Sequence, residues 1–152
     1  MSTINLDQLS LEELNQLKQQ EEARLEALGT RYAALRAAAA RLSASMSAVS
    51  EITPSTEGKE VLVPLTESVY VPGKIREPNK LLVDIGTGFY VEKTAKETTG
   101  FLDRKLKIVD ANSDNITKAV TSTRQNIESL KLLEIRAKQE GQRMRARDEE
   151  SN

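Results

Sequence analysis

The fold of this chain is decided by two stretches in its middle, EVLVPLTESVYVP (residues 60–72) and KLLVDIGTGFYVE (residues 80–92). Both are rich in β-branched and aromatic residues, and turn-forming residues interrupt each one, at 66–68 and at 86–88. This pattern predicts two β-hairpins. All four prolines lie in or beside this block, at positions 54, 64, 72 and 78. They separate two long proline-free segments that need a different interpretation.

The segment before the hairpins carries a heptad pattern. From Leu25 to Val49 its apolar residues alternate steps of three and four, which is typical of a coiled-coil seam. Ser10 followed by Glu13 resembles a capping box, and Thr53-Pro54 is a stop signal, so a helix is expected over about residues 10–52. The N-terminal end of this helix carries more leucine than one seam can bury.

The segment after the hairpins predicts a second coiled-coil helix. Thr94 followed by Glu97 is again a capping-box pattern, and a seam runs from Leu102 to Met144. Four seam positions hold poor seam residues, namely Ser113, Thr123, Glu134 and Gly141. A helix with so weak a seam needs a partner to hold it.

Charge indicates that the partner is the first helix. Six acidic residues lie between positions 7 and 28, whereas six basic residues lie between positions 131 and 147. We therefore expect the chain to fold back on itself, so that the acidic and basic ends meet. The alternative is that each charge run is only a solvated helix face.

The predicted fold class is α+β, mostly α: a long antiparallel coiled-coil hairpin with two β-hairpins between its helices. The expected domains are a helix over 1–53, an oligomerisation platform over 54–93, and a helix with a frayed tail over 94–152.

The hairpins carry apolar side chains on both faces, and four short strands cannot close a barrel of ordinary size. Their unpaired edges favour pairing with other chains, so the strands are expected to contribute to an inter-subunit β-barrel. The expected oligomerisation residues are Val61, Val63, Leu65, Val69, Val71, Leu81, Val83, Ile85, Phe89 and Val91.

Composition argues against an enzyme. The chain has no Cys and no His, which removes thiol nucleophiles, histidine-based proton transfer and zinc sites of the Cys/His type. Gly86-Thr87-Gly88 lacks the third glycine of a dinucleotide loop and is expected to be a turn, and Asp84 and Glu92 beside it have no partner base. No cofactor and no catalytic or metal-binding residue is predicted.

The sequence also bears on partners and location. A net charge of -1 and an acidic final turn give no general attraction to nucleic acid, and no apolar run reaches membrane-spanning length. The N-terminus does not resemble a signal peptide. A cytoplasmic location is expected, with nuclear access left open.

The hairpin block resembles a known family. VPLTESVYVPGKI (63–75), LLVDIGTGFYVEKTA (81–95) and the opening INLDQLSLEELNQLKQQ (4–20) are similar to α-type subunits of eukaryotic prefoldin, a co-chaperone. The resemblance implies a heterohexamer of two α-type and four β-type subunits, in which the hairpins form a double β-barrel platform. It further implies that coiled-coil tips hold unfolded proteins, notably actin and tubulin, for transfer to the cytosolic group II chaperonin without nucleotide.

The resemblance places client contacts near the chain's termini. The candidates are Leu6, Leu9, Leu11, Leu14, Leu17, Leu132, Leu133, Ile135 and Met144. Leu11 and Leu14 keep the seam register, so ordinary coiled-coil core is the alternative for both. The alternative function is a structural adaptor or transcription-linked scaffold that binds one folded partner.

Overall fold

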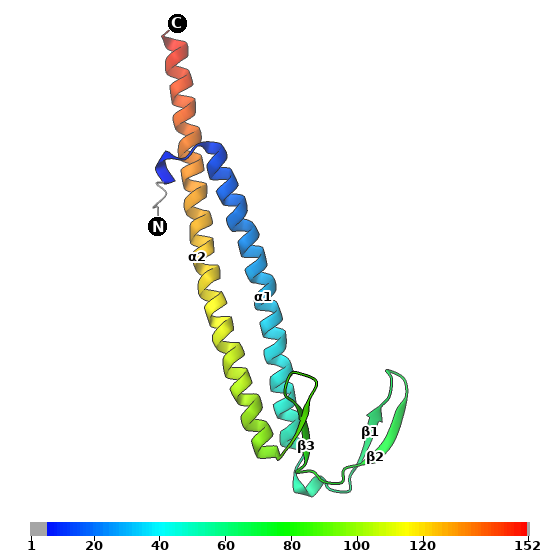
Figure 1. Ribbon diagram of the computed structural model, residues 1–152. Coiled ribbons are helices and arrows are strands. Elements are labelled where there is room, and N and C mark those ends of the chain that lie inside the picture. Colours follow the sequence, from blue (N-terminus) through cyan, green and yellow to red (C-terminus); the bar gives the residue numbers. More distant parts are fainter. Residues whose placement is uncertain (1–5, 152) are drawn as a thin grey trace. The chain divides into compact units, whose positions relative to one another are not determined.

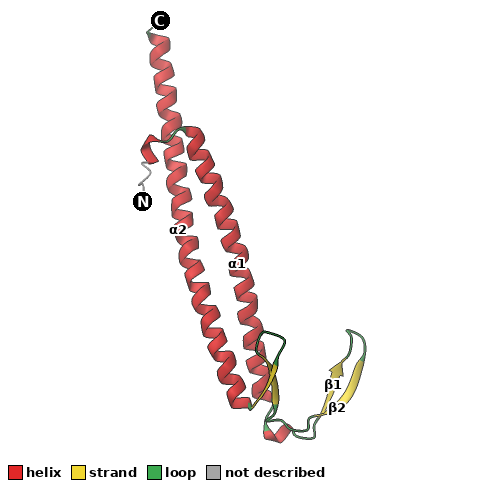
Figure 2. Ribbon diagram, in the orientation of Figure 1, coloured by secondary structure: helices red, strands yellow, loops and turns green. Residues whose placement is uncertain are grey.

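The computed structural model describes residues 6–151 (Figures 1 and 2). The elements are a 3-10 turn η1 (Leu6–Gln8), helix α1 (Leu11–Glu51), a 3-10 turn η2 (Pro54–Thr56), strands β1 (Glu60–Pro64), β2 (Tyr70–Lys74), β3 (Leu81–Asp84) and β4 (Tyr90–Lys93), and helix α2 (Ala95–Glu150). The predicted order of helix, two hairpins and helix is confirmed. The chain divides into two compact units. Unit 1 contains the residues up to Ala34 and from Asn112 onward, and unit 2 contains Leu35–Ala111.

Both helices begin with the predicted capping boxes. The Ser10 backbone N–H donates to Glu13 Oε2 at 2.8 Å, and the Glu13 N–H donates to Ser10 Oγ at 3.3 Å. At the start of α2, the Glu97 N–H donates to Thr94 Oγ1 at 3.2 Å and the Thr94 N–H to Glu97 Oε2 at 3.4 Å. Each box satisfies backbone donors that a helix start otherwise leaves unpaired. The hydrogen bond from the Ser10 backbone also lowers the pKa of Glu13.

In unit 1 the two helices run antiparallel, as the sequence predicts (Figure 1). Their shared core contains Leu14, Ile116, Ile127 and Leu130. Ser113 and Thr123, which are weak seam residues by sequence, are buried at seam positions. Within residues 6–151 every buried side-chain nitrogen or oxygen has a hydrogen-bond partner, so the polar seam positions leave no buried group unsatisfied.

The end of α2 differs from the expected frayed tail. The helix continues to Glu150, and Figure 1 shows it extending past the start of α1. Every residue from 141 to 150 is exposed. Gly141 therefore lies outside the packed seam. From about this residue onward α2 is no longer buried, but it remains helical.

Unit 2 contains two separate antiparallel hairpins, β1–β2 and β3–β4. Val63 pairs with Val71 in the first, and Val83 pairs with Val91 in the second. Gly86 and Gly88 have φ of 99° and 79°, values that favour glycine, and the Gly86 N–H donates to Asp84 Oδ1 at 2.8 Å. The Gly-Thr-Gly segment is therefore a hairpin turn, as predicted, and Asp84 stabilises it.

The β3–β4 hairpin packs one face on the helices of its own unit. Val83 is only 8% exposed, and a cavity of about 320 Å³ beside it is lined by Val49 of α1 and by Phe101 and Leu102 of α2. Leu82, which points to the opposite face, is 72% exposed. The sequence assigned Val83 to the oligomerisation face. Within this chain the helices of the same unit cover the side chain, and a role of Val83 in assembly stays a prediction.

Val83→Asp should therefore lower the stability of the chain itself, because it places an unpaired carboxylate in a covered apolar site. We expect a loss of roughly 3 kcal/mol or more in the free energy of unfolding, measured by urea titration followed by circular dichroism. Leu82→Asp on the same strand is the matched control and should stay within about 0.5 kcal/mol of the parent chain. Equal losses in both variants would contradict the packing of this hairpin.

Candidate functional sites

The β1–β2 hairpin presents apolar side chains on both faces. Cross-strand partners share a face in an antiparallel pair, so Val61, Val63 and Val71 lie on one side. Leu65 and Val69, joined by a 2.8 Å backbone hydrogen bond from the Leu65 N–H, continue that side around the turn. Leu62 and Tyr70 lie on the other side. All seven side chains are exposed within this chain, which makes both faces available to partners.

The β3–β4 hairpin is covered on one face only in part. Val83 is buried and Leu81 half-buried, but Ile85, Phe89 and Val91 remain exposed on the same face, toward the turn. Leu82 and Tyr90 are exposed on the opposite face. The predicted oligomerisation set omitted Leu62, Tyr70, Leu82 and Tyr90. The alternation of side chains along each strand could have identified these four residues. Each one lies next to a residue of the predicted set and therefore on the opposite face of the hairpin.

The second candidate surface is the open end of unit 1, which we define as residues 6–21 and 126–150. Leu132, Ile135 and Met144 are 65%, 54% and 69% exposed, so three of the predicted client residues stand in solvent on α2. Leu6 and Leu11 are more than one-third exposed, and Leu9, Leu17 and Leu133 are half-buried.

Leu14 does not belong to this surface. It is 3% exposed and packs in the core of unit 1, which is the alternative that its seam position left open. Its assignment as a client contact stays a prediction, and its burial favours the core alternative.

A charged cluster holds the two helices together at the open end. Lys18 Nζ of α1 lies 2.7 Å from Glu134 Oε2, and Lys138 Nζ lies 2.6 Å from Glu134 Oε1. The hydrogen bonds from Lys138 and Lys18 lower the pKa of Glu134 to about 2. The bond to Glu134 raises the pKa of Lys18. Glu134, a poor seam residue by sequence, thus occupies its position as an ion-pair partner.

This ion pair has the opposite polarity to the predicted one. The sequence led us to expect acidic side chains of α1 against basic side chains of α2, yet here α1 supplies the lysine and α2 the glutamate. Glu21 of α1 accepts a hydrogen bond from neutral Asn126 of α2 at 3.2 Å. Arg143, Arg145 and Arg147 are exposed. Individual contacts, and not the overall charge of each end, join the helices here.

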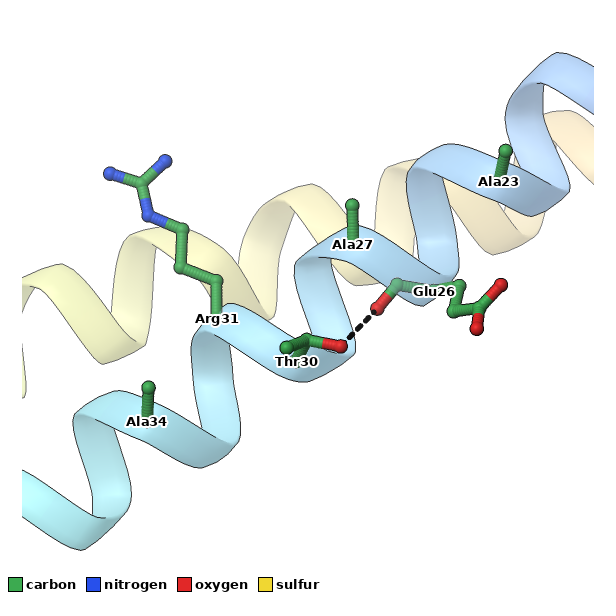
Figure 3. A pocket seen from close by; sticks show the side chains of 6 residues that line it. All are labelled: Ala23, Glu26, Ala27, Thr30, Arg31 and Ala34. Carbon is green, nitrogen blue, oxygen red and sulfur yellow. Dashed lines mark hydrogen bonds between the residues drawn. The ribbon is translucent and has the colours of Figure 1, made fainter.

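A shallow hollow in unit 1 lies on the surface of α1 (Figure 3). It has a volume of about 540 Å³ and is lined by Ala23, Glu26, Ala27, Thr30, Arg31 and Ala34, all from one helix. Thr30 Oγ1 donates to the Glu26 carbonyl oxygen at 3.2 Å. The hollow lies over a stripe of small side chains. Among its six lining residues, Glu26 and Arg31 are the charged ones.

Between Leu6 and Ser151 no group of three or more His, Cys, Asp or Glu side chains is placed to hold a metal ion. Neither described helix has a stretch long and apolar enough to span a membrane.

The fold and these surfaces define a class of protein: a coiled-coil hairpin whose middle segment carries unpartnered β-hairpins. The prefoldin subunit family matches residues 17–139. "Probable prefoldin subunit 5" of Schizosaccharomyces pombe is 43% identical over 119 residues, which cover 77% of each chain. "Prefoldin subunit 5" of Homo sapiens is 38% identical over 118 residues, 78% of this chain and 77% of the human one.

A further relative and a solved structure agree. "Probable prefoldin subunit 5" of Dictyostelium discoideum is 38% identical over 127 residues, 84% of this chain and 79% of that protein. A chain of filamentous PFD from Methanocaldococcus jannaschii, solved by cryo-electron microscopy, shares the fold with a TM-score of 0.69. It is 24% identical, and the likeness covers 76% of this chain and 96% of that one. The chain belongs to the prefoldin family, which indicates a subunit of a prefoldin co-chaperone complex.

The Glu134 cluster predicts a specific pH dependence. Because folding lowers the pKa of Glu134 from 4.5 to about 2, its ionised form stabilises the fold above about pH 4.5, and this contribution is lost as the pH falls toward 2. Glu134→Gln removes the contribution. The difference in urea midpoint between the parent chain and Glu134→Gln should therefore shrink between about pH 5.5 and pH 2.

The control is Glu140→Gln, an exposed carboxylate on the same helix. Its difference from the parent chain should stay small throughout this range. A Glu134→Gln difference that does not change with pH would show that the cluster does not hold the helices together.

Proposed function

We propose that this chain is an α-type subunit of a heterohexameric prefoldin with two α-type and four β-type subunits. In this proposal it acts as an ATP-independent holdase: its hairpins assemble with other subunits, and the open end of unit 1 holds unfolded proteins. One observation carries the proposal, namely that the β1–β2 hairpin exposes apolar side chains on both faces.

The assembly role follows from the physics of a two-stranded sheet. An isolated hairpin is marginally stable in water, and its edges carry unpaired N–H and C=O groups. Val63 and Val71 on one face and Leu62 on the other remain in solvent within this chain. Strands from neighbouring subunits would bury these side chains and pair the edges, which supports an inter-subunit β-barrel. Two such hairpins in one chain support the α-type assignment that the resemblance implies.

The holding role is supported by apolar residues at outward positions of the open end. Leu132, Ile135 and Met144 are exposed and do not belong to the buried core of this chain. Each such side chain offers about 1.5–3 kcal/mol when it is fully buried against a client, so a single contact is weak. Several subunits that bind one client would combine such contacts through effective concentration.

The further details of the proposal rest on the family resemblance. We propose unfolded proteins such as actin and tubulin as clients, and the cytosolic group II chaperonin as the acceptor. We propose the cytoplasm as the location, with nuclear access, and no enzymatic activity, cofactor, nucleic acid or membrane as part of the function.

Assembly is tested by co-expressing the chain with β-type prefoldin subunits. Val63→Asp should reduce recovery of the complex tenfold or more, measured by size-exclusion chromatography with mass determination, because the barrel would have to bury a carboxylate. Ile108→Asp is the control, since Ile108 is exposed on α2 in the same unit. Unchanged complex with Val63→Asp would contradict the use of this hairpin face in assembly.

Holding is tested by the ability of the assembled complex to suppress aggregation of denatured actin without nucleotide. Leu132→Ser combined with Ile135→Ser should weaken suppression several-fold while the complex stays intact, because two outward apolar contacts are lost. Ile108→Ser is the control. If the unaltered complex suppresses no aggregation and instead binds one folded protein, the adaptor alternative replaces the holdase.

A further inference from the structure

The two hairpins of unit 2 repeat one pairing pattern but differ at two corresponding positions. Each hairpin contains one pair with a tyrosine and one pair with a leucine. These pairs are Pro64 with Tyr70 and Leu62 with Pro72 in the first hairpin, and Asp84 with Tyr90 and Leu82 with Glu92 in the second. The tyrosine and the leucine keep their places, whereas two prolines in the first hairpin correspond to two carboxylates in the second.

Two backbone hydrogen bonds show which residues form the outer edges of the β1–β2 hairpin. The Leu65 N–H donates to the Val69 carbonyl oxygen at 2.8 Å, and the Ile75 N–H donates to the Lys59 carbonyl oxygen at 3.0 Å. In an antiparallel ladder, hydrogen-bonded pairs alternate with pairs whose N–H and C=O groups point outward. Both bonds join odd-numbered residues. The even-numbered residues therefore turn their backbone groups outward, at 60, 62 and 64 in β1 and at 70, 72 and 74 in β2.

Each outer edge of this hairpin consequently lacks one hydrogen-bond donor. Pro64 on β1 and Pro72 on β2 both stand at outward positions, and proline has no backbone N–H. On β2 the missing donor is the central one, between the N–H groups of Tyr70 and Lys74. Both prolines are exposed, so neither contributes to the core of the chain. Because they face outward, they also cost the hairpin none of its own ladder bonds.

The missing donors penalise contacts between two copies of this chain. A strand that pairs with either edge places one carbonyl opposite a proline, and that carbonyl loses water without gaining a new partner. When the edges of two such hairpins meet, each copy contributes a proline, so two carbonyls are left unpaired. A strand that has no proline leaves only one carbonyl unpaired. The β1–β2 edges thus discriminate against copies of themselves.

The second hairpin carries a different feature at the corresponding positions. The Ile85 N–H donates to the Phe89 carbonyl oxygen at 3.1 Å, so the alternation places Asp84 and Glu92 at the outer edges. Both residues keep their N–H groups, and both side chains are exposed. An edge contact between two copies of this hairpin would bring like-charged carboxylates onto one face. Prolines and charged side chains are the two common means by which sheets avoid edge-to-edge pairing.

We propose that Pro64 and Pro72 prevent the β1–β2 hairpin from pairing edge to edge with another copy of this chain, and thereby reserve it for strands of different subunits. The first part stands on the backbone geometry of the hairpin alone. The second part rests on the proposed assembly function. The partner that fits these edges is a strand without a proline at the facing position.

Restoring the donors in the full chain tests the first part. Pro64→Ala combined with Pro72→Ala returns both outward N–H groups and should tighten self-association about tenfold or more, measured by sedimentation velocity over a range of concentrations. Pro54→Ala combined with Pro78→Ala is the matched control, because these two prolines lie outside the strands. No tightening in the edge variant, or equal tightening in the control, would overturn the proposal.

Hydrogen exchange at the new amides provides the second measurement. In the monomeric edge variant, the new N–H at position 72 should exchange freely, because it faces outward. In the associated form it should be protected, because it pairs with a strand of the other copy. Protection in the monomer would contradict the outward placement. Exchange without protection in the associated form would show that another surface joins the copies. Either result overturns the proposal.

Co-expression with β-type subunits distinguishes the inference from the function. The edge variant should place a larger fraction of the chain in homomers than the parent does, and an unchanged fraction would overturn the second part. If the parent forms no mixed complex but the edge variant self-associates through position 72, the assembly proposal fails and the exclusion of copies stands. If the mixed complex forms and the edge variant does not self-associate, the assembly proposal stands and the exclusion fails.

Discussion

The constraint on which the rest of this structure depends is that a two-stranded hairpin cannot cover its own faces. The chain repeats one hairpin pattern twice, with a central valine pair, Val63 with Val71 and Val83 with Val91, and a tyrosine before each second valine. Unit 2 covers part of one face of the second hairpin through Val83, whereas the corresponding Val63 of the first hairpin stays exposed. The same pattern is therefore used once within the chain and once, under our proposal, between chains.

The open end of unit 1 inverts the usual distribution of side chains on a paired helix. Glu134, a charged residue, occupies a seam position with its side chain 13% exposed, while the neighbouring Leu132 and Ile135 point into solvent. An amphipathic helix normally places its charges outside and its leucines inside. Here Lys18 and Lys138 compensate the inward carboxylate, so the helices stay joined without using Leu132 or Ile135. The apolar residues nearby are thus free to bind something else.

Features that depend on neighbours in sequence were predictable, and features that depend on packing were not. Ser10 with Glu13 and Thr94 with Glu97 specify helix starts through local hydrogen bonds, and Gly86 and Gly88 specify a turn through their backbone freedom. The strand pattern does not indicate which face α1 and α2 cover, so the burial of Val83 within its own unit was not predicted. The burial of Leu14 was left open because its register fits both core and surface.

The charges, too, allowed one feature to be predicted and not another. Summed over each end, the charges predicted acidic α1 against basic α2, and the antiparallel arrangement came out correctly. The interhelical contact between Lys18 and Glu134 has the reverse polarity, because an ion pair depends on which side chains share the seam and not on the total charge of a segment. The summed charge of two segments can indicate that the helices run antiparallel. The register of the helices determines which side chains form ion pairs.

Under the proposed function, holding a client without nucleotide requires weak contacts. When no hydrolysis drives release, a client leaves only if its contacts break at thermal energies, so each site must contribute little and several sites must act together. Under this proposal, the outward placement of Leu132 and Ile135 suits binding that several subunits can sustain and that one cannot.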